Sequence, residues 1–425
     1  MGWKALTCEL LIVGAGPAGM AAAVAAAESG RRVVLLDDNP SAGGQIWRDG
    51  PQMLLPEIAR QYRDMLRRSS AITHLRGSKS IAVLEEKRVL YEQEDASGVI
   101  HYQRLVLCCG ARELLLPFPG WTLPGVTGAG GLQALIKGGV SLKKERVVIA
   151  GSGPLLPVVA QSVKKAGGQV VYIAEQAGAA QLGRFLAGMW RWPGKGLQSL
   201  SLFDRHYRPG SWVVSAQGES QIRQVTIAQG ERNITLDCER LACGFGLIAN
   251  IELALALGCD ISHQAIWVDE WQQTSRADIY AAGECTGIGG SEQALVEGKI
   301  AGYAASDNQE QAQRLWPARR RWQRFARALD EAFQLDARLK QLPRSQTLLC
   351  RCEDVPLGLV TQAADWRQAK IYSRCGMGAC QGKVCGAAAR FLLDWPLAAP
   401  RPPFAPARVE TLIAAGEASP TAEGD

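Results

Sequence analysis

The sequence predicts an α/β protein with two dinucleotide-binding units, the second inserted into the first, and a small helical module near the C-terminus. Two glycine-rich turns predict the units, because each lies between an apolar strand and a helix in a β–α–β order, at residues 8–38 and 146–175. Five cysteines between residues 350 and 385 predict the third module, since thiols gathered in so short a stretch indicate a shared chemical role.

The composition is that of an ordinary folded protein. The chain has 425 residues, of which 47% are hydrophobic and 46 are glycine, and this length allows two or three packed domains. With 47 basic and 41 acidic residues, the formal net charge is only +6. The basic residues are spread along the chain, so we expect no nucleic-acid binding. Arg319 to Arg321 form an exception, interpreted as a solvated face of a helix.

The role expected for the cysteines depends on where the protein resides. Met1 is not followed by a cleavage-like segment, and the alanine-rich run 18–27 is too short to span a bilayer, so we expect neither a signal peptide nor a transmembrane segment. The expected location is the cytoplasm, including the inner face of a membrane if partners hold the chain there. Structural disulfides are not expected in a reducing compartment, so the C-terminal group indicates metal or redox chemistry.

The first glycine-rich turn has the complete pattern of a dinucleotide site. An apolar strand at residues 8–13 leads into Gly14-Ala-Gly16-Pro-Ala-Gly19, a helix and a second strand that ends at Asp37. Gly14, Gly16 and Gly19 allow a tight turn and a close approach of the pyrophosphate to the helix N-terminus. Asp37 is expected to bind a ribose hydroxyl, with Asp38 as the second choice. The pattern predicts binding of an ADP-containing nucleotide.

The second turn departs from this pattern. Residues 146–150 form the expected strand, and Gly151-Ser-Gly153 begins the turn, but Leu156 stands where a third glycine is usual. Glu175 ends the following strand and would disfavour a 2′-phosphate, so NAD is preferred to NADP if a dinucleotide binds. Two alternatives stay open: a unit that binds NAD, and a retained fold that holds another adenine nucleotide or none.

The cysteine group consists of Cys350-Arg-Cys352 and, after 22 residues, a glycine-rich stretch with Cys375, Cys380 and Cys385. Closely spaced thiolates in such backbone suit an iron–sulfur cluster or a zinc ion. A helix expected at residues 386–394 would place its N-terminus beside two of them and favour their negative charge. A redox-inert zinc explains less beside dinucleotide units, so the cluster is preferred, with zinc and free thiols as alternatives.

Two segments resemble the thioredoxin-reductase-like FAD-binding flavoproteins. Residues 39–48 resemble the loop that lines the flavin side of their site, and residues 277–284 resemble a second segment near the ribityl chain and the phosphates. The resemblance implies FAD in the first unit, although another ADP-containing nucleotide stays an alternative. It implies further contacts from Gly44, Gln45, Gly283 and Glu284.

The cysteine spacing resembles the [2Fe-2S] domain of bacterioferritin-associated ferredoxin, with a wider second pair. Together with this module, residues 116–126, 244–247 and 374–385 resemble the α (A) subunits of multimeric amino-acid dehydrogenases. That group includes opine oxidases, D-hydroxyproline dehydrogenases, dye-linked proline dehydrogenases and hydrogen cyanide synthases, and the resemblance covers residues 8–395. It implies the cluster ligands Cys350, Cys352, Cys380 and Cys385. Cys375 would be a spare thiol that could substitute for one of them.

The resemblance implies a discontinuous FAD-binding domain, an inserted NAD-like unit, a helical linker, a [2Fe-2S] domain and a poorly ordered tail. Their expected bounds are 1–118 with 241–310, 119–240, 311–345, 346–395 and 396–425.

The implied function is electron transfer in a membrane-linked dehydrogenase that oxidises an amino or imino acid of the opine or D-hydroxyproline type. Implied partners are a quinone or other acceptor, a small ferredoxin-like γ subunit, and a flavin-containing β subunit with the substrate site, with FMN where two subunits meet. No catalytic residue is assigned to this chain.

Two other functions remain as alternatives. The first is an NADH-dependent flavin reductase that feeds its own cluster, against which the altered turn at Leu156 argues. The second is a cofactor-bearing scaffold that serves only assembly. Disulfide reduction of the thioredoxin-reductase type is not expected, because the inserted unit has no Cys-x-x-Cys.

Overall fold

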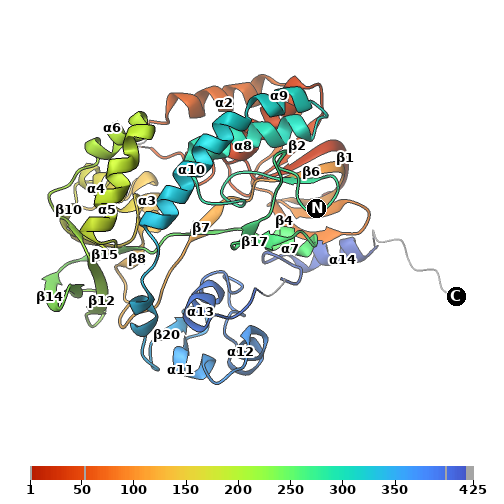
Figure 1. Cartoon of the computed structure of the whole chain (residues 1–425). Coiled ribbons are helices and arrows are strands. Elements are labelled where there is room, and N and C mark those ends of the chain that lie inside the picture. The colour runs from red at the N-terminus through yellow and green to blue at the C-terminus, as the bar shows by residue number, and fades with distance from the viewer. Residues whose placement is uncertain (1, 52–53, 398–399, 418–425) are drawn as a thin grey trace.

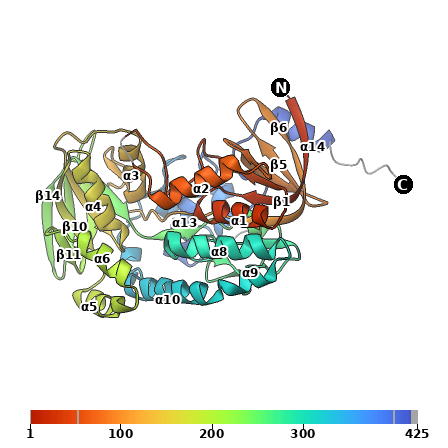
Figure 2. The ribbon, with the colours of Figure 1, turned by 90° about the horizontal axis from the view of Figure 1, so that it is seen from above.

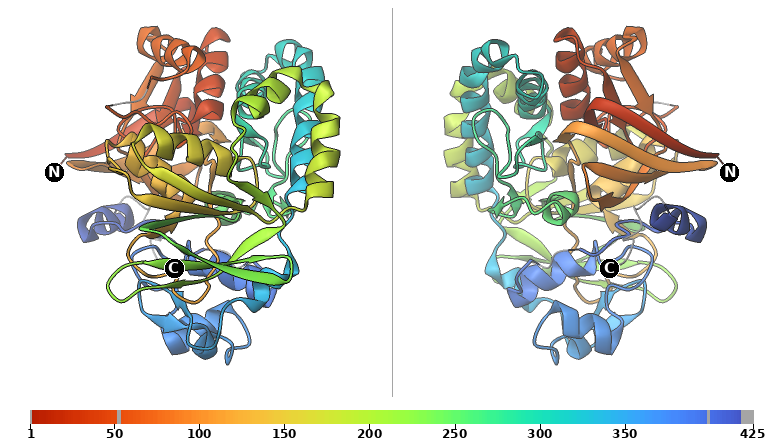
Figure 3. Two further views of the ribbon diagram at one scale, coloured as in Figure 1. Left: turned by 90° about the vertical axis from the view of Figure 1, so that its left-hand side faces the viewer. Right: turned by 90° about the vertical axis from the view of Figure 1, so that its right-hand side faces the viewer.

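The computed structural model describes residues 2–51, 54–397 and 400–417 (Figure 1). Two α/β units, each with its own largely parallel sheet, lie side by side, and a small helical module lies below both in the views of Figures 1 and 3. We call them the first unit, the second unit and the cysteine module. Among the described residues, no helix is both long enough and apolar enough to cross a bilayer.

The first unit is built on a seven-stranded sheet in the order β3-β2-β1-β6-β5-β4, with β19 also paired to β6. Strands β1, β2, β3, β6 and β19 are parallel to one another, whereas β5 pairs antiparallel with both β6 and β4. All four residues of β2 are buried, as expected for a parallel strand covered on both faces. The bounds are β1 (Gly2–Val13), β2 (Val33–Leu36), β3 (Ile72–Leu75), β4 (Lys79–Leu84), β5 (Arg88–Glu92), β6 (Ala96–Leu107) and β19 (Ile279–Ala281).

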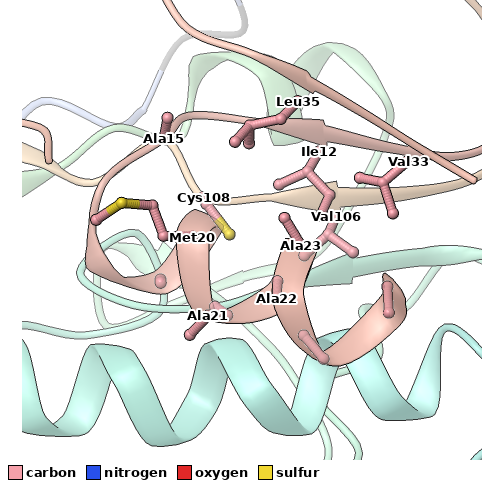
Figure 4. Close-up of a cluster of buried hydrophobic side chains, with 14 of the residues drawn as sticks. Ile12, Ala15, Met20, Ala21, Ala22, Ala23, Val33, Leu35, Val106 and Cys108 are labelled. Carbon is pink, nitrogen blue, oxygen red and sulfur yellow. The ribbon is translucent and has the colours of Figure 1, made fainter. Parts of the chain in front are cut away.

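Helix α1 (Pro17–Glu28) packs between this sheet and α8 (Gly290–Ala304) through very small side chains. Figure 4 shows the alanines of α1 against Ile12, Leu35 and Val106 of the sheet. On the other side of α1, a Cβ atom at Gly298 would lie 2.2 Å from the carbonyl oxygen of Ala18. The backbones of the two helices therefore touch. The remaining helices of this unit are α2 (Glu57–Arg68) and α7 (Glu252–Ala256), and β17 (Ile261–Ser262) and β18 (Ala265–Ile266) form a small hairpin.

The second unit has a five-stranded parallel sheet in the order β11-β10-β9-β15-β8 and a three-stranded antiparallel sheet, β12-β13-β14. The bounds of its strands are β8 (Val126–Gly128), β9 (Arg146–Gly151), β10 (Gln169–Glu175), β11 (Tyr207–Pro209), β12 (Ser211–Gln217), β13 (Gln224–Gln229), β14 (Arg232–Asp237) and β15 (Arg240–Gly244). Its helices are α3 (Ala129–Lys137), α4 (Leu155–Lys165), α5 (Ala179–Gly188), the 3-10 turn η1 (Met189–Arg191) and α6 (Pro193–Ser201).

The chain passes between the units later than the sequence predicted. The predicted boundary returned residues 241 onward to the first unit, but β15 pairs with β8 and β9 and belongs to the second sheet. The chain crosses back in β16 (Leu247–Ala249), which pairs antiparallel with the outgoing strand β7 (Ala111–Glu113). A short apolar strand fits either sheet, so its sequence could not reveal its neighbours.

Two helices lead from the first unit to the cysteine module. They are α9 (Gln309–Arg314) and α10 (Trp316–Ala332), followed by the 3-10 turn η2 (Ala337–Gln341). The module has a core of its own, with buried Leu349, Val360 and Ala388 and the half-buried ring of Trp366. Its elements are β20 (Leu348–Cys350), β21 (Val355–Pro356), α11 (Leu357–Val360), α12 (Trp366–Ser373) and α13 (Cys385–Leu393).

The C-terminal segment packs more closely than its composition suggested. Residues 409–417 form helix α14, where the sequence predicted poor order. Thr411 donates a 2.7 Å hydrogen bond to Glu92, and Ala415 packs among Ile81 and Leu90 of the first sheet. These contacts involve residues more than 300 positions away, which local composition does not reveal. Residues 398–399 and 418–425 of the predicted tail lie outside the described residues.

The contact between α1 and α8 leaves no room for a methyl group. In Gly298→Ala and Gly302→Ala, the new Cβ atoms would lie 2.2 and 2.3 Å from carbonyl oxygens of α1, so the helices must separate. We expect each to cost about 1–3 kcal/mol and to lower the Tm by roughly 2–10 °C in a thermal melt. Gly183→Ala is the control, because no described atom lies within 4 Å of its Cβ position. An unchanged Tm in both α8 variants would contradict the packing.

Candidate functional site

The first glycine-rich turn lies at the carboxyl end of β1, and two of its glycines are required by close backbone contacts. A Cβ atom at Gly14, where φ is +103°, would lie 2.2 Å from the carbonyl oxygen of Cys108. A Cβ atom at Gly19 would lie 1.7 Å from the carbonyl oxygen of Gly14. At Gly16, by contrast, no described atom lies within 4 Å of the Cβ position. The turn is therefore tightly packed at its back, where Gly14 meets Cys108, and open at its front, in the space beside Gly16.

The loop predicted to line the site lies directly on this turn. The backbone N–H of Gly43 donates a 2.7 Å hydrogen bond to the carbonyl oxygen of Ala15. A Cβ atom at Gly44 would lie 3.2 Å from the Cα of Gly16, so the two glycines face each other closely. The side chain of Gln45 accepts a 2.7 Å hydrogen bond from Arg48. Gly44 and Gln45 thus belong to the same edge of the sheet as the turn.

Asp37 is buried at the end of β2 and holds the turn in place. One carboxylate oxygen accepts a hydrogen bond from the backbone N–H of Ala15, and the other accepts from the backbone and side-chain N–H groups of Asn39, at 2.7 and 2.9 Å. These contacts orient the carboxylate beside the turn. The role predicted for it, binding a ribose hydroxyl, stays a prediction.

The segment around Gly283, which is far from the turn in sequence, lies at the same edge because it follows β19 of the first sheet. Gly283, with φ of +82°, packs against Ala18 in the first turn of α1. Its N–H donates a 3.1 Å hydrogen bond to the buried carboxylate of Glu297, whose pKa is raised by burial. Burial also raises the pKa of Glu284. All eight residues predicted to bind the nucleotide therefore lie at one edge. They are Gly14, Gly16, Gly19, Asp37, Gly44, Gln45, Gly283 and Glu284.

The second glycine-rich turn is covered by the chain itself. Ser152 donates a 3.1 Å hydrogen bond to the carbonyl oxygen of Phe333, and Gln176 donates a 2.8 Å hydrogen bond to that of Gln334. The ring of Phe333 also contacts that of Phe185, with centroids 5.5 Å apart. Residues 333–334 thus lie across the carboxyl ends of β9 and β10. A dinucleotide in this type of fold places its pyrophosphate and ribose there.

Glu175, the acidic residue of the second turn, is hydrogen-bonded to its own turn and to Tyr207. The buried carboxylate of Glu175 accepts from the N–H groups of Gly153 and Ala177, at 3.0 and 2.8 Å, and from the hydroxyl of Tyr207, at 2.8 Å. Leu156, at the third glycine position, is completely buried in the core of this unit. The carboxylate of Asp37 is bonded to its own turn in a similar way, so the feature that favours a closed second unit is the covering by residues 333–334.

The cysteine module brings three thiols together in its interior. The sulfur atoms of Cys350, Cys375 and Cys385 all lie within 4.8 Å of one another, and all three residues are buried. Cys350 ends β20, Cys385 begins α13, and Cys375 follows α12, where Arg374 adopts a left-handed φ of +62° and turns the chain inward. The hydrogen bond with Cys375 and burial raise the pKa of Cys385.

The other two thiols form an outer pair. Cys352 is exposed and Cys380 is half-buried, and the backbone and side chain of Cys380 hydrogen-bond the sulfur of Cys352. Burial acts to raise the pKa of Cys380, but backbone N–H donors at Val384 and Gly382 hold it below the usual value. Cys375 thus lies inside the buried group, and the spare role predicted for it stays a prediction. Residue spacing does not reveal which way a thiol points.

The glycines of this module allow its loop to close around the thiols. Cβ atoms at Gly376, Gly382 and Gly386 would lie 2.6 to 3.2 Å from the ring of Trp366. A Cβ atom at Gly378 would lie 2.3 Å from the Cβ of Cys352. Five soft sulfur donors gathered from two segments of the module suit an iron–sulfur cluster, which needs four thiolates, and equally satisfy the ligand count for zinc.

Residues 375–385, which we call the thiol loop, contact Arg112 of the connecting strand β7, a residue that sequence reasoning missed. The Arg112 guanidinium donates to the carbonyl oxygen of Lys383 at 3.3 Å and pairs with Glu252 at 2.9 Å. It also donates a 2.6 Å hydrogen bond to Asn250, whose amide in turn donates to the carbonyl oxygen of Cys109 at 2.8 Å. The only sequence signal was a charged residue shortly after a buried strand.

Comparisons with known proteins show a family and several relatives. The family model described as pyridine nucleotide-disulphide oxidoreductase matches residues 8–309. Hydrogen cyanide synthase subunit HcnB of Pseudomonas protegens is 32% identical, over 88% of this chain and 89% of that protein. An opine oxidase subunit of Agrobacterium tumefaciens is 30% identical, over 89% of this chain and 84% of that protein.

Two solved structures show the same fold at low sequence identity. The L-proline dehydrogenase from P. horikoshii is 17% identical with a TM-score of 0.71, covering 97% of this chain and 80% of that one. The thioredoxin reductase of T. acidophilum is 19% identical with a TM-score of 0.54, covering 71% and 98%. The predicted fold class, two dinucleotide-binding units in an α/β chain, is confirmed.

The open front of the first turn can be tested without disturbing the fold. Gly16→Ala places a methyl group where no described atom lies within 4 Å, so we expect unchanged stability. The same methyl group would stand in the path of a pyrophosphate, so we expect the purified variant to lose at least about tenfold in bound nucleotide. Extraction and quantification of the nucleotide per chain measures this.

The matched control is Gly178→Ala. Gly178 is also a helix N-cap with open space around its Cβ position, but it lies in the second unit, before α5. It should keep the full nucleotide content. If Gly16→Ala keeps it as well, the first turn does not bind the nucleotide.

Proposed function

This chain belongs to the pyridine nucleotide-disulphide oxidoreductase family, and we propose that it is the flavin- and cluster-bearing electron-transfer subunit of a heteromeric dehydrogenase. It is an oxidoreductase with homologues named as subunits of larger enzymes, as the resemblance predicted. We call the edge of the first sheet where the eight predicted residues lie the nucleotide edge. The observation that carries the proposal is a chain of hydrogen bonds from the thiol loop to this edge. Lys383, between Cys380 and Cys385, bonds to Arg112, which is linked through Asn250 to Cys109 at that edge.

The first unit supplies the features that FAD requires. Its turn is open in front at Gly16, and the first turn of α1 carries no acidic residue that would repel a pyrophosphate. We propose that FAD is held by the eight residues predicted from the sequence, namely Gly14, Gly16, Gly19, Asp37, Gly44, Gln45, Gly283 and Glu284. A flavin takes up two electrons and releases them singly, which a one-electron cluster needs.

In the cysteine module we propose a [2Fe-2S] cluster held by Cys350, Cys352, Cys380 and Cys385. Cys350 and Cys385 lie in the buried group, and the outer pair lies next to it. The lowered pKa of Cys380 favours the thiolate that a metal requires. Cys375 would stay beside the cluster as a fifth thiol. Trp366 and the glycines packed on it hold the loop closed around the site.

The substrate is proposed to bind to a partner. In this arrangement a flavin-containing β subunit oxidises an amino or imino acid of the opine or D-hydroxyproline type, with FMN where the two subunits meet. Electrons then pass through this chain to a quinone or another acceptor, with a small ferredoxin-like γ subunit completing the complex. The relatives are named as parts of an opine oxidase and of a hydrogen cyanide synthase, and these names support a multi-subunit enzyme.

The alternative, an NADH-dependent flavin reductase, is disfavoured by the covered second turn. NADH would have to displace residues 333–334 from Ser152 and Gln176. The source of electrons is therefore proposed to be the partner and not a nicotinamide.

This preference gives a direct test. When NADH is added without oxygen to the purified chain, we expect the flavin absorbance to stay unchanged, because the second turn is covered. Dithionite is the control that shows the flavin to be reducible, and the β subunit with its substrate should bleach the flavin. Rapid bleaching by NADH would establish the alternative. Full-rate dye reduction by the β subunit without this chain would instead favour the scaffold.

The ligand assignment is tested by single substitutions. Cys350→Ser and Cys385→Ser should each abolish the visible absorbance and EPR signal of the cluster, because each removes a buried thiolate, while the flavin content stays unchanged. Cys375→Ser should keep the cluster, since four other thiols remain. Cys243→Ser, in the second sheet, is the control for a buried cysteine outside the module. Loss of the cluster in Cys375→Ser would make Cys375 a ligand.

A further inference from the structure

Among the described residues, the largest group of exposed apolar side chains near one another in the sequence lies on α5, α6 and the turn between them. We call this group the α5–α6 surface, and the two helices with their turn the α5–α6 hairpin. Its five large side chains are between 54% and 83% exposed. They are Leu186, Trp190, Leu197, Leu200 and Phe203. Clusters of this kind on a protein surface mark an interaction site more often than chance.

The helices that carry these side chains are attached to the molecule elsewhere. Of the described residues in α5 and α6, none is buried. Met189 and Trp192, in and just after the turn, supply the anchor: the ring of Trp192 packs on Phe325 of α10 at 5.3 Å, and its indole N–H donates to the carbonyl oxygen of Arg321. The exposed side chains are therefore not needed to hold the hairpin in place.

The exposed side chains follow helical spacing. Leu197 and Leu200 are three residues apart on α6, so their side chains point in similar directions, and the exposed Phe203 lies just beyond the end of that helix. Leu186 and Trp190 are four residues apart and share a side of α5 and the turn that follows. Each half of the hairpin thus presents an apolar ridge to solvent.

The charge of this surface is one-sided. Residues 176–203 contain no Asp or Glu. Asp204, which follows, is buried and paired with Lys164 at 2.6 Å, and Glu292 is paired with Lys195 at 2.7 Å. Acidic side chains near the hairpin occur at the end of α10, at Asp330 and Glu331. Exposed arginines on and beside the hairpin are Arg184, Arg191, Arg205, Arg208, Arg320, Arg321 and Arg324.

We propose that the α5–α6 surface docks on an anionic lipid membrane. Leucine, tryptophan and phenylalanine side chains enter the headgroup region of a bilayer, and arginines bind lipid phosphates in two-pronged hydrogen bonds. Arg191 already lies over the ring of Trp190, 5.3 Å from its centroid, so a cation and an aromatic ring are presented together. Anionic lipid matches the excess of arginine, and each basic side chain near such a surface adds to the attraction.

The location of the surface is compatible with docking. Figure 2 shows α5 and α6 at one end of the molecule, with α14 at the opposite end. The thiol loop, on the cysteine module, lies apart from the hairpin in Figure 1 and would stay accessible. The resemblance already implies a membrane-linked complex, and this inference adds which surface of the chain itself meets the membrane. It can be tested apart from the redox role, because a membrane contact at this surface is compatible with any such role.

Vesicle flotation with the full chain tests the proposal. The wild-type chain should float with vesicles of phosphatidylcholine and phosphatidylglycerol, much less with phosphatidylcholine alone, and less as salt is added. The variant with Leu197→Gln, Leu200→Gln and Phe203→Gln should bind the anionic vesicles at least about tenfold less. Its flavin and iron content should equal those of the wild type, which keeps this result separate from a failure of the proposed function.

The control removes an equal number of exposed aliphatic side chains at the other end of the molecule. It carries Val409→Gln, Leu412→Gln and Ile413→Gln on α14 and should float as the wild type does. The proposal is overturned if the wild type ignores anionic vesicles or if the α6 variant floats equally well. If the wild type ignores vesicles and the α6 variant loses a partner protein during purification, the surface is a protein interface instead.

Discussion

The close backbone packing of α1 is the constraint on which the nucleotide edge depends. Gly14 and Gly19 bring the turn against the strand behind it, and Gly298 brings α8 against the other side of the helix. With no side chains between these backbones, the N-terminus of α1 has only one position, at the carboxyl end of β1. The positive end of the helix dipole then faces the open space in front of Gly16. The loop at Gly44 and the block at Gly283 pack on the same turn and complete the edge.

The cysteine module is joined to this edge by a small polar contact. Arg112 and Glu252 are both partly exposed, so their ion pair adds little stability, and its main effect is on orientation. The hydrogen bond from Arg112 goes to the backbone of Lys383, between two cysteines. It therefore fixes the thiol loop itself and not only a side chain. The module has its own small core, but it also packs on the second unit, where Ala387 joins the core around Trp121 and the indole N–H of Trp121 donates a 2.7 Å hydrogen bond to the carbonyl oxygen of Leu348. The contact at Lys383 therefore orients the thiol loop within a module that is attached at several points.

The two glycine-rich turns show how similar local structures can differ in role. In each, the acidic residue at the end of the second strand accepts a hydrogen bond from the backbone of its own turn, Asp37 from Ala15 and Glu175 from Gly153. The edge of the first unit is open at Gly16. The edge of the second unit is covered by residues 333–334, which lie more than 150 residues further along the chain. The covering segment, and not the turn, makes the difference.

The sequence by itself determined the elements whose cause is local: the strand, glycine turn and helix at residues 8–28, the altered turn at Leu156, and the presence of a thiol-rich module. Glycine spacing is readable because backbone contacts at such turns exclude every other residue type. Only the tertiary structure decided which sheet takes β15, that residues 409–417 pack on the first sheet, and that Cys375 points inward beside Cys350 and Cys385. These outcomes depend on contacts between residues far apart in the chain. Neither spacing nor composition encodes the direction in which a strand, a helix or a thiol finds its neighbour.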